Sequence, residues 1–135
     1  MDLQEPRAGQ KHPLDEYLGP FFTTQTLAPW LGVTVEAVLK RVTESTLIAL
    51  QMGNGDFLYP TFQFTERRTV IPHLMEAVGS LRVAIPDTWS CAMWVNTKLE
   101  SLGNSSVAEL LSTGEPNDFK VAMWFVETEA ARLSQ

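Results

Sequence analysis

The chain has 135 residues, of which 44% are hydrophobic, and it carries a formal net charge of −6 with a sequence pI near 4.8. A chain of this length can bury one sizeable core or two small ones. The acidic balance disfavours the class of proteins that coat nucleic acid non-specifically, because those proteins neutralise phosphates with a surplus of Lys and Arg. Any contact with DNA therefore has to be local.

The sequence contains few features that are typical of an enzyme, a metal-binding protein or an exported protein. Cys91 is the single cysteine, so no disulfide forms within the chain, and His12 and His73 lie far apart. We find no Gly-rich phosphate loop and no HExxH, CxxC or GxSxG motif. No apolar run approaches the ~18 residues of a membrane span, and the N-terminus lacks the apolar core of a signal peptide. We expect a cytoplasmic protein that is not an enzyme and takes no cofactor or metal.

Residues 23–42 predict two short helices joined by a tight turn. Thr23 or Thr24 can cap the first helix, Gly32 suits a left-handed stop, and Thr34 can cap the second helix. This is the outline of a helix-turn-helix motif, whose second helix enters the major groove. A pair of short helices with a glycine turn also occurs in folds that never touch DNA, and that alternative remains open.

A hairpin follows the helix pair within the stretch QMGNGDFLYPTFQF, residues 51–64. Asn54-Gly55 is a strong turn signal between two β-prone runs, which gives the winged arrangement of a helix-turn-helix. The tip offers no cation, whereas a wing that grips phosphates usually uses Lys, Arg or backbone amides. The hairpin can therefore be a wing in shape and a structural clasp in use. Its aromatic residues, expected to be core rather than base-stacking, are Phe57, Tyr59, Phe62 and Phe64.

The predicted second helix carries the candidate DNA contacts. Lys40 and Arg41 face solvent, where they can reach base edges or phosphates, and Thr34 offers a hydroxyl at the helix start. With so few cations per subunit, useful affinity needs a dimer on two half-sites or a larger complex. The apolar stripe of this helix comprises Val35, Val38, Leu39 and Val42. The full set of candidate DNA-binding residues is Thr34, Glu36, Lys40, Arg41, Arg67 and Arg68.

The second half of the chain predicts a small helical bundle. Each predicted helix has a start signal, and two of them have a glycine stop. In chain order these signals are Pro72 for the first helix, Asp87 and Gly103 for the second, Ser105, Ser106 and Gly114 for the third, and Asn117 or Asp118 for the last. The predicted fold class is mainly α with a small β-hairpin. The predicted divisions are a flexible arm at 1–20, a helix-turn-helix with a hairpin wing at 21–68, and a helical domain at 69–135 that can serve dimerisation or partner binding.

Several short motifs resemble a known family in their order and spacing. The chain from Thr23 to Phe64 is similar to the helix-turn-helix half of bacterial antitoxins of the Xre/MbcA/ParS group, and the second half is similar to their toxin-binding domain. The motifs of the second half are Asp87-Thr88-Trp89, the helix around Trp94, Leu102-Gly103 and Leu110-Leu111-Ser112-Thr113-Gly114. The departures are Asn104, where the family often has a second glycine, the run Ser105-Ser106-Val107, where the family often starts the short helix with a proline, and a wing without basic residues.

This resemblance implies an antitoxin that neutralises an NAD-degrading toxin of the RES-domain type by covering its active site, and that can bind operator DNA to regulate its own operon. The implied assemblies are a homodimer or a larger toxin–antitoxin complex. The alternative from a different class is a winged helix-turn-helix transcription regulator whose helical half dimerises and which has no toxin partner.

The candidate partner-binding residues lie in the second half. The resemblance implies that the C-terminal tail, with Arg132, reaches into the toxin. Trp89 and Trp94 are five residues apart, so they lie on different faces of one helix, and we expect Trp89 to be core. The candidate set is Trp94, Lys98, Trp124, Phe125 and Arg132. The alternative is that the tryptophans fill the core and that the terminus is frayed.

Overall fold

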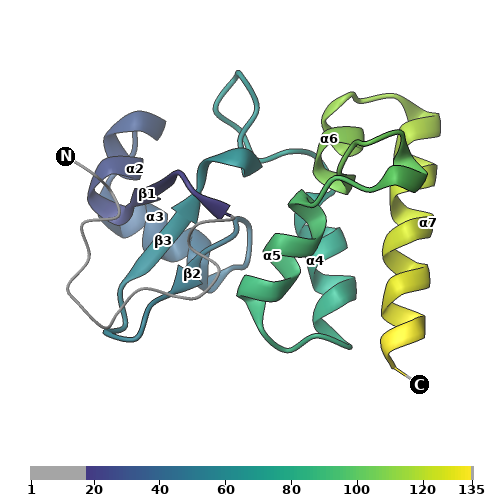
Figure 1. Cartoon of the computed structure of the whole chain (residues 1–135). Helices are drawn as coiled ribbons and strands as arrows, with labels where there is room; N and C mark the ends of the chain where they lie inside the picture. Colours follow the sequence, from purple (N-terminus) through teal and green to yellow (C-terminus); the bar gives the residue numbers. More distant parts are fainter. Residues whose placement is uncertain (1–17, 135) are drawn as a thin grey trace. The chain divides into compact units, whose positions relative to one another are not determined.

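The computed structural model of the chain describes residues 18–134, so most of the predicted arm, residues 1–17, lies outside the described residues. The chain divides into two compact units, residues 1–61 and 62–135, which are described separately. The described residues form six α-helices and a three-stranded antiparallel sheet (Figure 1). This confirms the predicted fold class, mainly α with a small β-hairpin. Residues 62–68, which we expected to go with the hairpin, group with the helices.

The first unit contains the predicted pair of short helices, α2 (Thr24–Leu31) and α3 (Val35–Thr43). The Thr23 side chain accepts a hydrogen bond from the N–H of Thr26, and the Thr34 side chain accepts one from Ala37, so both caps form as predicted. Between the helices, Gly32 has φ 74°, the left-handed conformation that ends a helix. Local sequence therefore determines where this helix pair begins, turns and ends.

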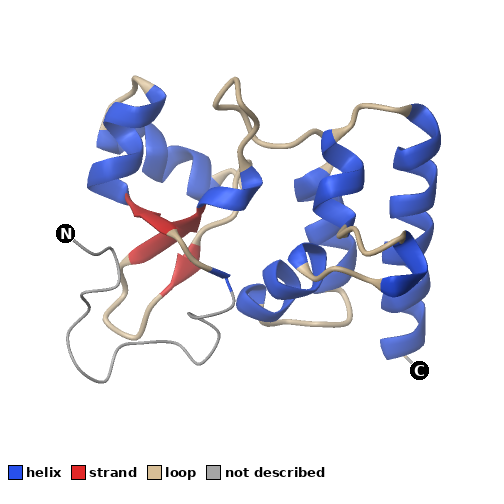
Figure 2. Ribbon diagram, turned by 45° about the horizontal axis from the view of Figure 1, so that its top comes forward, coloured by secondary structure: helices blue, strands red, loops and turns tan. Residues whose placement is uncertain are grey.

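A small sheet holds the helix pair. Strands β1 (Phe21–Thr23), β2 (Leu50–Gln51) and β3 (Phe57–Pro60) lie in the order β1-β3-β2, and both pairings are antiparallel. The β2–β3 hairpin was predicted, whereas β1 was not. Figure 2 shows the strands in red beside the helix pair. The buried Tyr59 hydroxyl lies 2.8 Å from the Thr24 hydroxyl, a hydrogen bond that ties the central strand to the start of α2.

The second unit is the predicted helical bundle. It contains α4 (Leu74–Arg82), α5 (Thr88–Asn96), α6 (Val107–Ser112) and α7 (Pro116–Leu133), with a short 3₁₀ turn at Glu100–Leu102. Another 3₁₀ turn, Thr61–Gln63, begins at the last residue of the first unit. Helix α4 packs against α5 and α7, and α6 also packs against α5 and α7. The buried core includes Leu74, Leu81, Trp89, Val95, Val107 and Val126. Trp89 is therefore core, as expected.

Three helix boundaries in this unit differ from the prediction. Helix α7 begins at Pro116, after Glu115, and not at Asn117 or Asp118. Pro72 does not lie in the first turn of α4, because His73 adopts a left-handed conformation, φ 68°, and the helix begins at Leu74. Helix α5 ends at Asn96 and does not continue to Gly103. The chain beyond α5 is extended at Leu99, where it forms an isolated β-bridge with Ser105, and a helical Leu99 could not make that bridge.

The turn that closes this bridge explains one departure from the resembled family. Gly103 and Asn104 are both left-handed, with φ of 66° and 65°. Asn is one of the few residues other than glycine that adopts this conformation readily. Asn104 therefore serves at the position where a second glycine is common in the antitoxins.

One residue of α3 also differs from expectation. Leu39 was placed in the apolar stripe, but it is 39% exposed, whereas Val38 is fully buried. Val38 is the buried residue of α3, and the positions around it lie at the boundary with solvent. Leu39 thus belongs to the surface beside Lys40.

The left-handed turn predicts the effect of a single methyl group. In Gly32→Ala the new Cβ meets no atom within 4 Å, so its cost arises from the backbone conformation alone. We expect the free energy of unfolding of the first unit to fall by about 1 kcal/mol. Urea denaturation measures it, with Gly53→Ala as the matched control because Gly53 also has open space but no positive φ. Equal stabilities of the two variants would contradict the assignment of strain to the Gly32 turn.

Candidate functional site

The exposed side of α3 is the candidate nucleic-acid interface. Val38 turns inward, while Glu36 and Lys40 are exposed and Arg41 is half-buried. The Thr34 hydroxyl caps the helix by accepting a hydrogen bond from Ala37, and its own O–H stays free to donate. The structure therefore brings four of the six predicted DNA-binding residues together on one short helix.

Positive charge within residues 18–61 is confined to this helix. Within residues 18–61, Lys40 and Arg41 are the only Lys or Arg residues. The Lys40 ammonium lies 4.0 Å from the Glu44 carboxylate, and the two side chains are 75% and 51% exposed. Ion pairs this exposed contribute about 0–1 kcal/mol, so Lys40 can exchange Glu44 for a phosphate or a base edge at little cost. The local cation that an acidic DNA-binding protein needs is present, and it lies on the second helix of the motif.

The hairpin tip contributes no such charge. The side-chain oxygen of Asn54 accepts a hydrogen bond from the Asp56 N–H at 2.9 Å, and the side-chain amide of Asn54 donates to the Asp56 carboxylate at 3.1 Å. The Met52 N–H donates to the Asp56 carbonyl at 2.8 Å, which closes the loop. The tip is thus held by its own hydrogen bonds and ends in a carboxylate. It has the shape of a wing without the phosphate-binding groups of one.

The two remaining predicted DNA contacts, Arg67 and Arg68, belong to the second unit. They lie in the loop between Phe64 and Val70, which form an isolated antiparallel bridge. Both side chains are in exposed positions, and Arg68 adopts a left-handed backbone with φ 63°. The predicted set is therefore divided between the units, with four residues on α3 and two in this loop.

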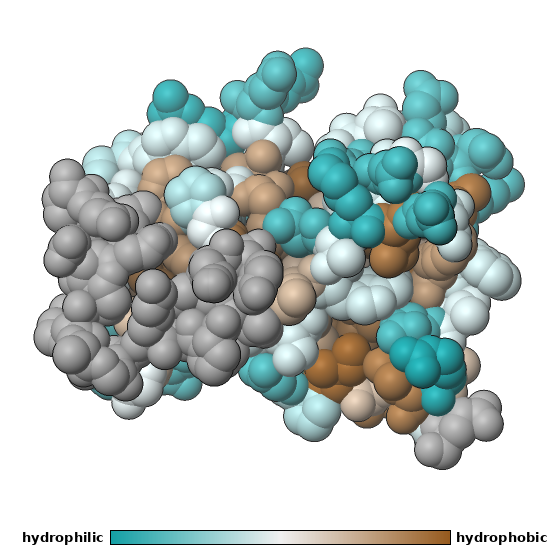
Figure 3. All heavy atoms as spheres, viewed as in Figure 1, coloured by the Kyte–Doolittle hydropathy of each residue, from teal (hydrophilic) through white to brown (hydrophobic). Residues whose placement is uncertain are grey.

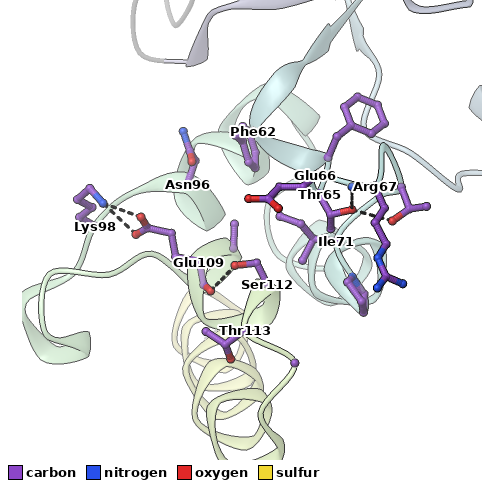
Figure 4. A pocket seen from close by; sticks show the side chains of 15 residues that line it. Phe62, Thr65, Glu66, Arg67, Ile71, Asn96, Lys98, Glu109, Ser112 and Thr113 are labelled. Atoms are coloured by element: carbon purple, nitrogen blue, oxygen red, sulfur yellow. Dashed lines mark hydrogen bonds and ion pairs between the residues drawn. The ribbon is translucent and has the colours of Figure 1, made fainter. Parts of the chain in front are cut away.

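Sequence reasoning missed a groove in the second unit, which has a volume of about 1080 Å³. Phe62, Phe64 and Ile71 form its apolar part (Figure 4). Lys98 lies at its edge, where the ammonium contacts the Glu109 carboxylate at 2.8 and 2.9 Å. The walls come from residues 62–72, 96–98 and 108–114. Because these segments are separated in the sequence, no local sequence pattern predicts the groove.

The predicted partner-binding residues come from two helices. Trp94 on α5 is half-buried, and Lys98 follows that helix and is paired with Glu109. On α7, Trp124 is 60% exposed and contacts the Phe125 ring edge-on, with centroids 5.0 Å apart. Arg132 is paired with Glu129 at 2.7 Å, a contact that raises the pKa of the guanidinium. Of these five residues, Trp124 presents the most exposed large apolar surface.

Figure 3 shows that the face of the second unit in view is mostly hydrophilic, with brown apolar areas at its lower edge. Figure 1 places the α4–α5 connection there. Val83 belongs to this connection and is 82% exposed. Single exposed apolar residues are common on soluble domains, so Val83 alone marks no site.

The remaining reactive groups have structural roles. The buried Cys91 thiol donates a hydrogen bond to the Ile85 carbonyl, and burial raises its pKa to about 11, which keeps it protonated. His73 lies 2.9 Å from Glu76 and packs its ring on Phe119. Residues 18–134 contain no cluster of three or more His, Cys, Asp or Glu side chains arranged to hold a metal ion. No helix in that part of the chain has both the length and the apolar character needed to cross a bilayer.

Comparisons with known proteins give a fold and no family. No family model matches the chain, and no curated protein matches it. The NMR structure of Rv2175c is similar, with a TM-score of 0.68 over 89% of this chain and 86% of that chain, at 21% sequence identity. The chain therefore shares the fold of Rv2175c over most of its length. At this identity the likeness does not extend to function, and the resemblance to the antitoxins stays a prediction.

The Glu109 carboxylate predicts an acid-sensitive contribution to stability. The Lys98 ammonium, followed by the Ser106 N–H, lowers the pKa of Glu109 below its ordinary value of 4.5. Because the folded pKa is the lower one, Glu109 stabilises the fold above about pH 4.5, and this contribution is lost as the pH falls further. We expect Glu109→Gln to lower the unfolding free energy by less than about 1 kcal/mol at neutral pH, with a difference that shrinks towards pH 3.

Urea denaturation at three pH values measures this difference. The matched control is the same substitution in a Lys98→Ala background, where its effect should be smaller at neutral pH because the ammonium is gone. A Glu109→Gln effect that is independent of both pH and Lys98 would contradict the ion-pair explanation.

Proposed function

We propose that this chain is a winged helix-turn-helix protein that binds specific DNA sequences through α3. The observation that carries the proposal is the confinement of Lys40 and Arg41, the cations of residues 18–61, to the exposed side of the second helix of the motif. The element order β1-α2-α3-β2-β3 and the sheet order β1-β3-β2 support it, because a winged motif places its sheet in this way beside the helix pair.

The dimensions and chemistry of α3 suit the major groove. Its nine residues span about 13 Å, and a major groove about 12 Å wide admits a helix end-on or along its length. The Lys40 ammonium can donate to guanine O6 or N7, and the Glu36 carboxylate can accept from cytosine N4. The Arg41 guanidinium can bind a phosphate, and the Thr34 hydroxyl can donate to another. These pairings read bases with few charges.

The small number of cations on α3 determines how the chain can bind DNA. The two cations on α3 neutralise about two phosphates, so their contribution to the slope of log affinity against log salt should be about −2 for each bound subunit. Contacts this few give weak binding to a single half-site. Useful affinity then comes from two subunits on half-sites about 34 Å apart.

The first test of DNA binding removes both cations. The full chain is used to select binding sites from a random duplex library, and affinity for the selected duplex is measured by fluorescence anisotropy over a salt series. We expect Lys40→Ala/Arg41→Ala to weaken binding by about 10- to 100-fold and to flatten the salt slope. Arg82→Ala, which removes an exposed cation at the end of α4, is the matched control and should change neither. Unaltered binding by the double variant would remove α3 as the recognition helix.

A second candidate function is neutralisation of a toxin of the RES-domain type, the function that the antitoxin resemblance implies. The exposed Trp124 favours it, because large aromatic side chains act as anchors in protein interfaces. Co-expression with a RES-domain enzyme encoded beside the gene for this chain tests it, with growth rescue and co-purification as readouts.

Deletion of the residues after Thr128 asks whether the end of α7 takes part in neutralisation. If Arg132 reaches into the toxin, growth rescue should be lost while the chain still folds, as judged by circular dichroism. Rescue that survives the deletion would remove Arg132 from the proposed toxin contact. A chain that neither rescues growth nor co-purifies with the enzyme would leave DNA binding as the function.

A further inference from the structure

The solvent side of α7 is a continuous face centred on Trp124. Successive residues turn by about 100° around a helix, so positions three, four and seven away from Trp124 lie on its side. On the opposite side, Ala122, Met123 and Val126 are buried in the core. We call the outward side the Trp124 face. Its members, all exposed, are Asn117, Lys120, Trp124, Glu127, Thr128 and Ala131.

The centre of this face is apolar and its flank is charged. Trp124 is 60% exposed, and Ala131 adds a small apolar position one turn beyond Thr128. Lys120 lies four residues before Trp124 and Glu127 three residues after it. Both turn to the same side of Trp124, by about 40° and 60°. Lys120 and Glu127 therefore lie on the same flank of the helix. Along the helix axis, the positive charge lies before the exposed Trp124 and the negative charge lies after it.

Lys120 and Glu127 differ from Lys98 and Arg132, the charged residues that we predicted to bind partners. Lys98 is held by Glu109, and Arg132 is held by Glu129. Across the described range 18–134, neither Lys120 nor Glu127 forms an ion pair. A charge that is unpaired within that range is available to a group on another molecule.

We propose that the Trp124 face binds a second copy of this chain, with the two α7 helices antiparallel about a two-fold axis that passes beside Trp124. Such an axis reverses the height along the helix and keeps the flank, so a residue before Trp124 lies near the partner's residue that is on the same flank at a similar distance after Trp124. Lys120 then lies about 6 Å from the axis along the helix, and the Glu127 of the other copy lies about 4.5 Å from it on the same side. Each dimer contains this complementary pair twice, and the tryptophans meet at the centre.

Self-complementarity is what selects a second copy as the occupant. In a two-fold interface the same patch must match itself, so each charge needs its opposite at the mirrored height. Lys120 and Glu127 meet that condition in the antiparallel arrangement. The other flank, with Val121 opposite Thr128 of the partner, brings no like charges together. A partner with a different sequence, such as a toxin, does not require the Trp124 face to be complementary to itself.

One helix face makes a weak dimer. An 18-residue helix is about 27 Å long and buries less than the ~800 Å² per partner of a standard interface. We expect a dissociation constant of about 10–100 µM for the free protein. The dimer is argued from α7 alone and is measured without DNA, so failure of the dimer and failure of DNA binding give different results.

Sedimentation equilibrium on the full chain from about 5 µM to about 1 mM tests the proposal. The unmodified chain should dimerise in this range, and Trp124→Ala should remain monomeric. Lys120→Glu and Glu127→Lys should each weaken the dimer by at least about 10-fold, because each places two like-charged pairs in the interface. Arg82→Glu is the matched control, since it reverses an exposed charge on α4, and it should leave the dimer unchanged.

Mixing the two charge variants gives the decisive measurement. A heterodimer of Lys120→Glu with Glu127→Lys has opposite charges at both contacts, so the mixture should dimerise about as well as the unmodified chain. The doubly reversed variant should also recover. A monomeric unmodified chain at about 1 mM would overturn the proposal, as would a mixture that stays monomeric or a Trp124→Ala variant that still dimerises. All the substituted positions are exposed, so circular dichroism should show each variant folded.

Discussion

The pairing of β1 with β3 is the constraint on which the first unit depends. Thr23 is the last residue of β1 and also the cap of α2, so the strand passes into the helix without a loop. Once Thr23 lies opposite Leu58, the start of α2 is held against the hairpin. The hydrogen bond between the Tyr59 and Thr24 hydroxyls holds the same junction from the side-chain layer. With α2 held at its start and turned at Gly32, α3 keeps Val38 inward and Lys40 outward, which is the arrangement that a recognition helix requires.

Much of this unit could be predicted because its signals are local. Thr23, Gly32, Thr34 and the Asn54-Gly55 turn each act within a few residues, through a cap or a left-handed backbone, so the sequence alone locates them. Strand β1 was not predictable in this way. It has three residues, and its partner strand begins more than 30 residues later in the chain. A strand this short has no periodic pattern of its own and becomes visible only through its pairing.

The second unit shows the same division between local and distant causes. The caps at Asp87 and Ser106 were predicted, but the end of α5 was not. Helix α5 ends early because Leu99 is extended and forms a β-bridge with Ser105, and a turn joins these two residues. The contact of Lys98 with Glu109 spans eleven residues and forms only after that turn has closed. The Glu129–Arg132 pair is different, since a spacing of three on one helix predicts it directly. The sequence interpretation considered each tryptophan by itself. It therefore did not predict the Trp124 face of α7, which depends on the charges beside Trp124.

Charge links the two proposals. A chain with a net charge of −6 is repelled by DNA as a whole, so two cations on α3 act against a background that opposes binding. A dimer doubles the background as well as the cations, and general attraction therefore does not improve. In the proposed dimer, the second copy adds a second α3 to the same complex, so a second half-site is bound without a further loss of translational freedom. Under this proposal, long-range repulsion suppresses binding to arbitrary sequences, and a site that matches both copies of α3 recovers the contacts needed to overcome it. In this view the acidic surface is a source of selectivity, and the small number of Lys and Arg residues is compatible with DNA recognition.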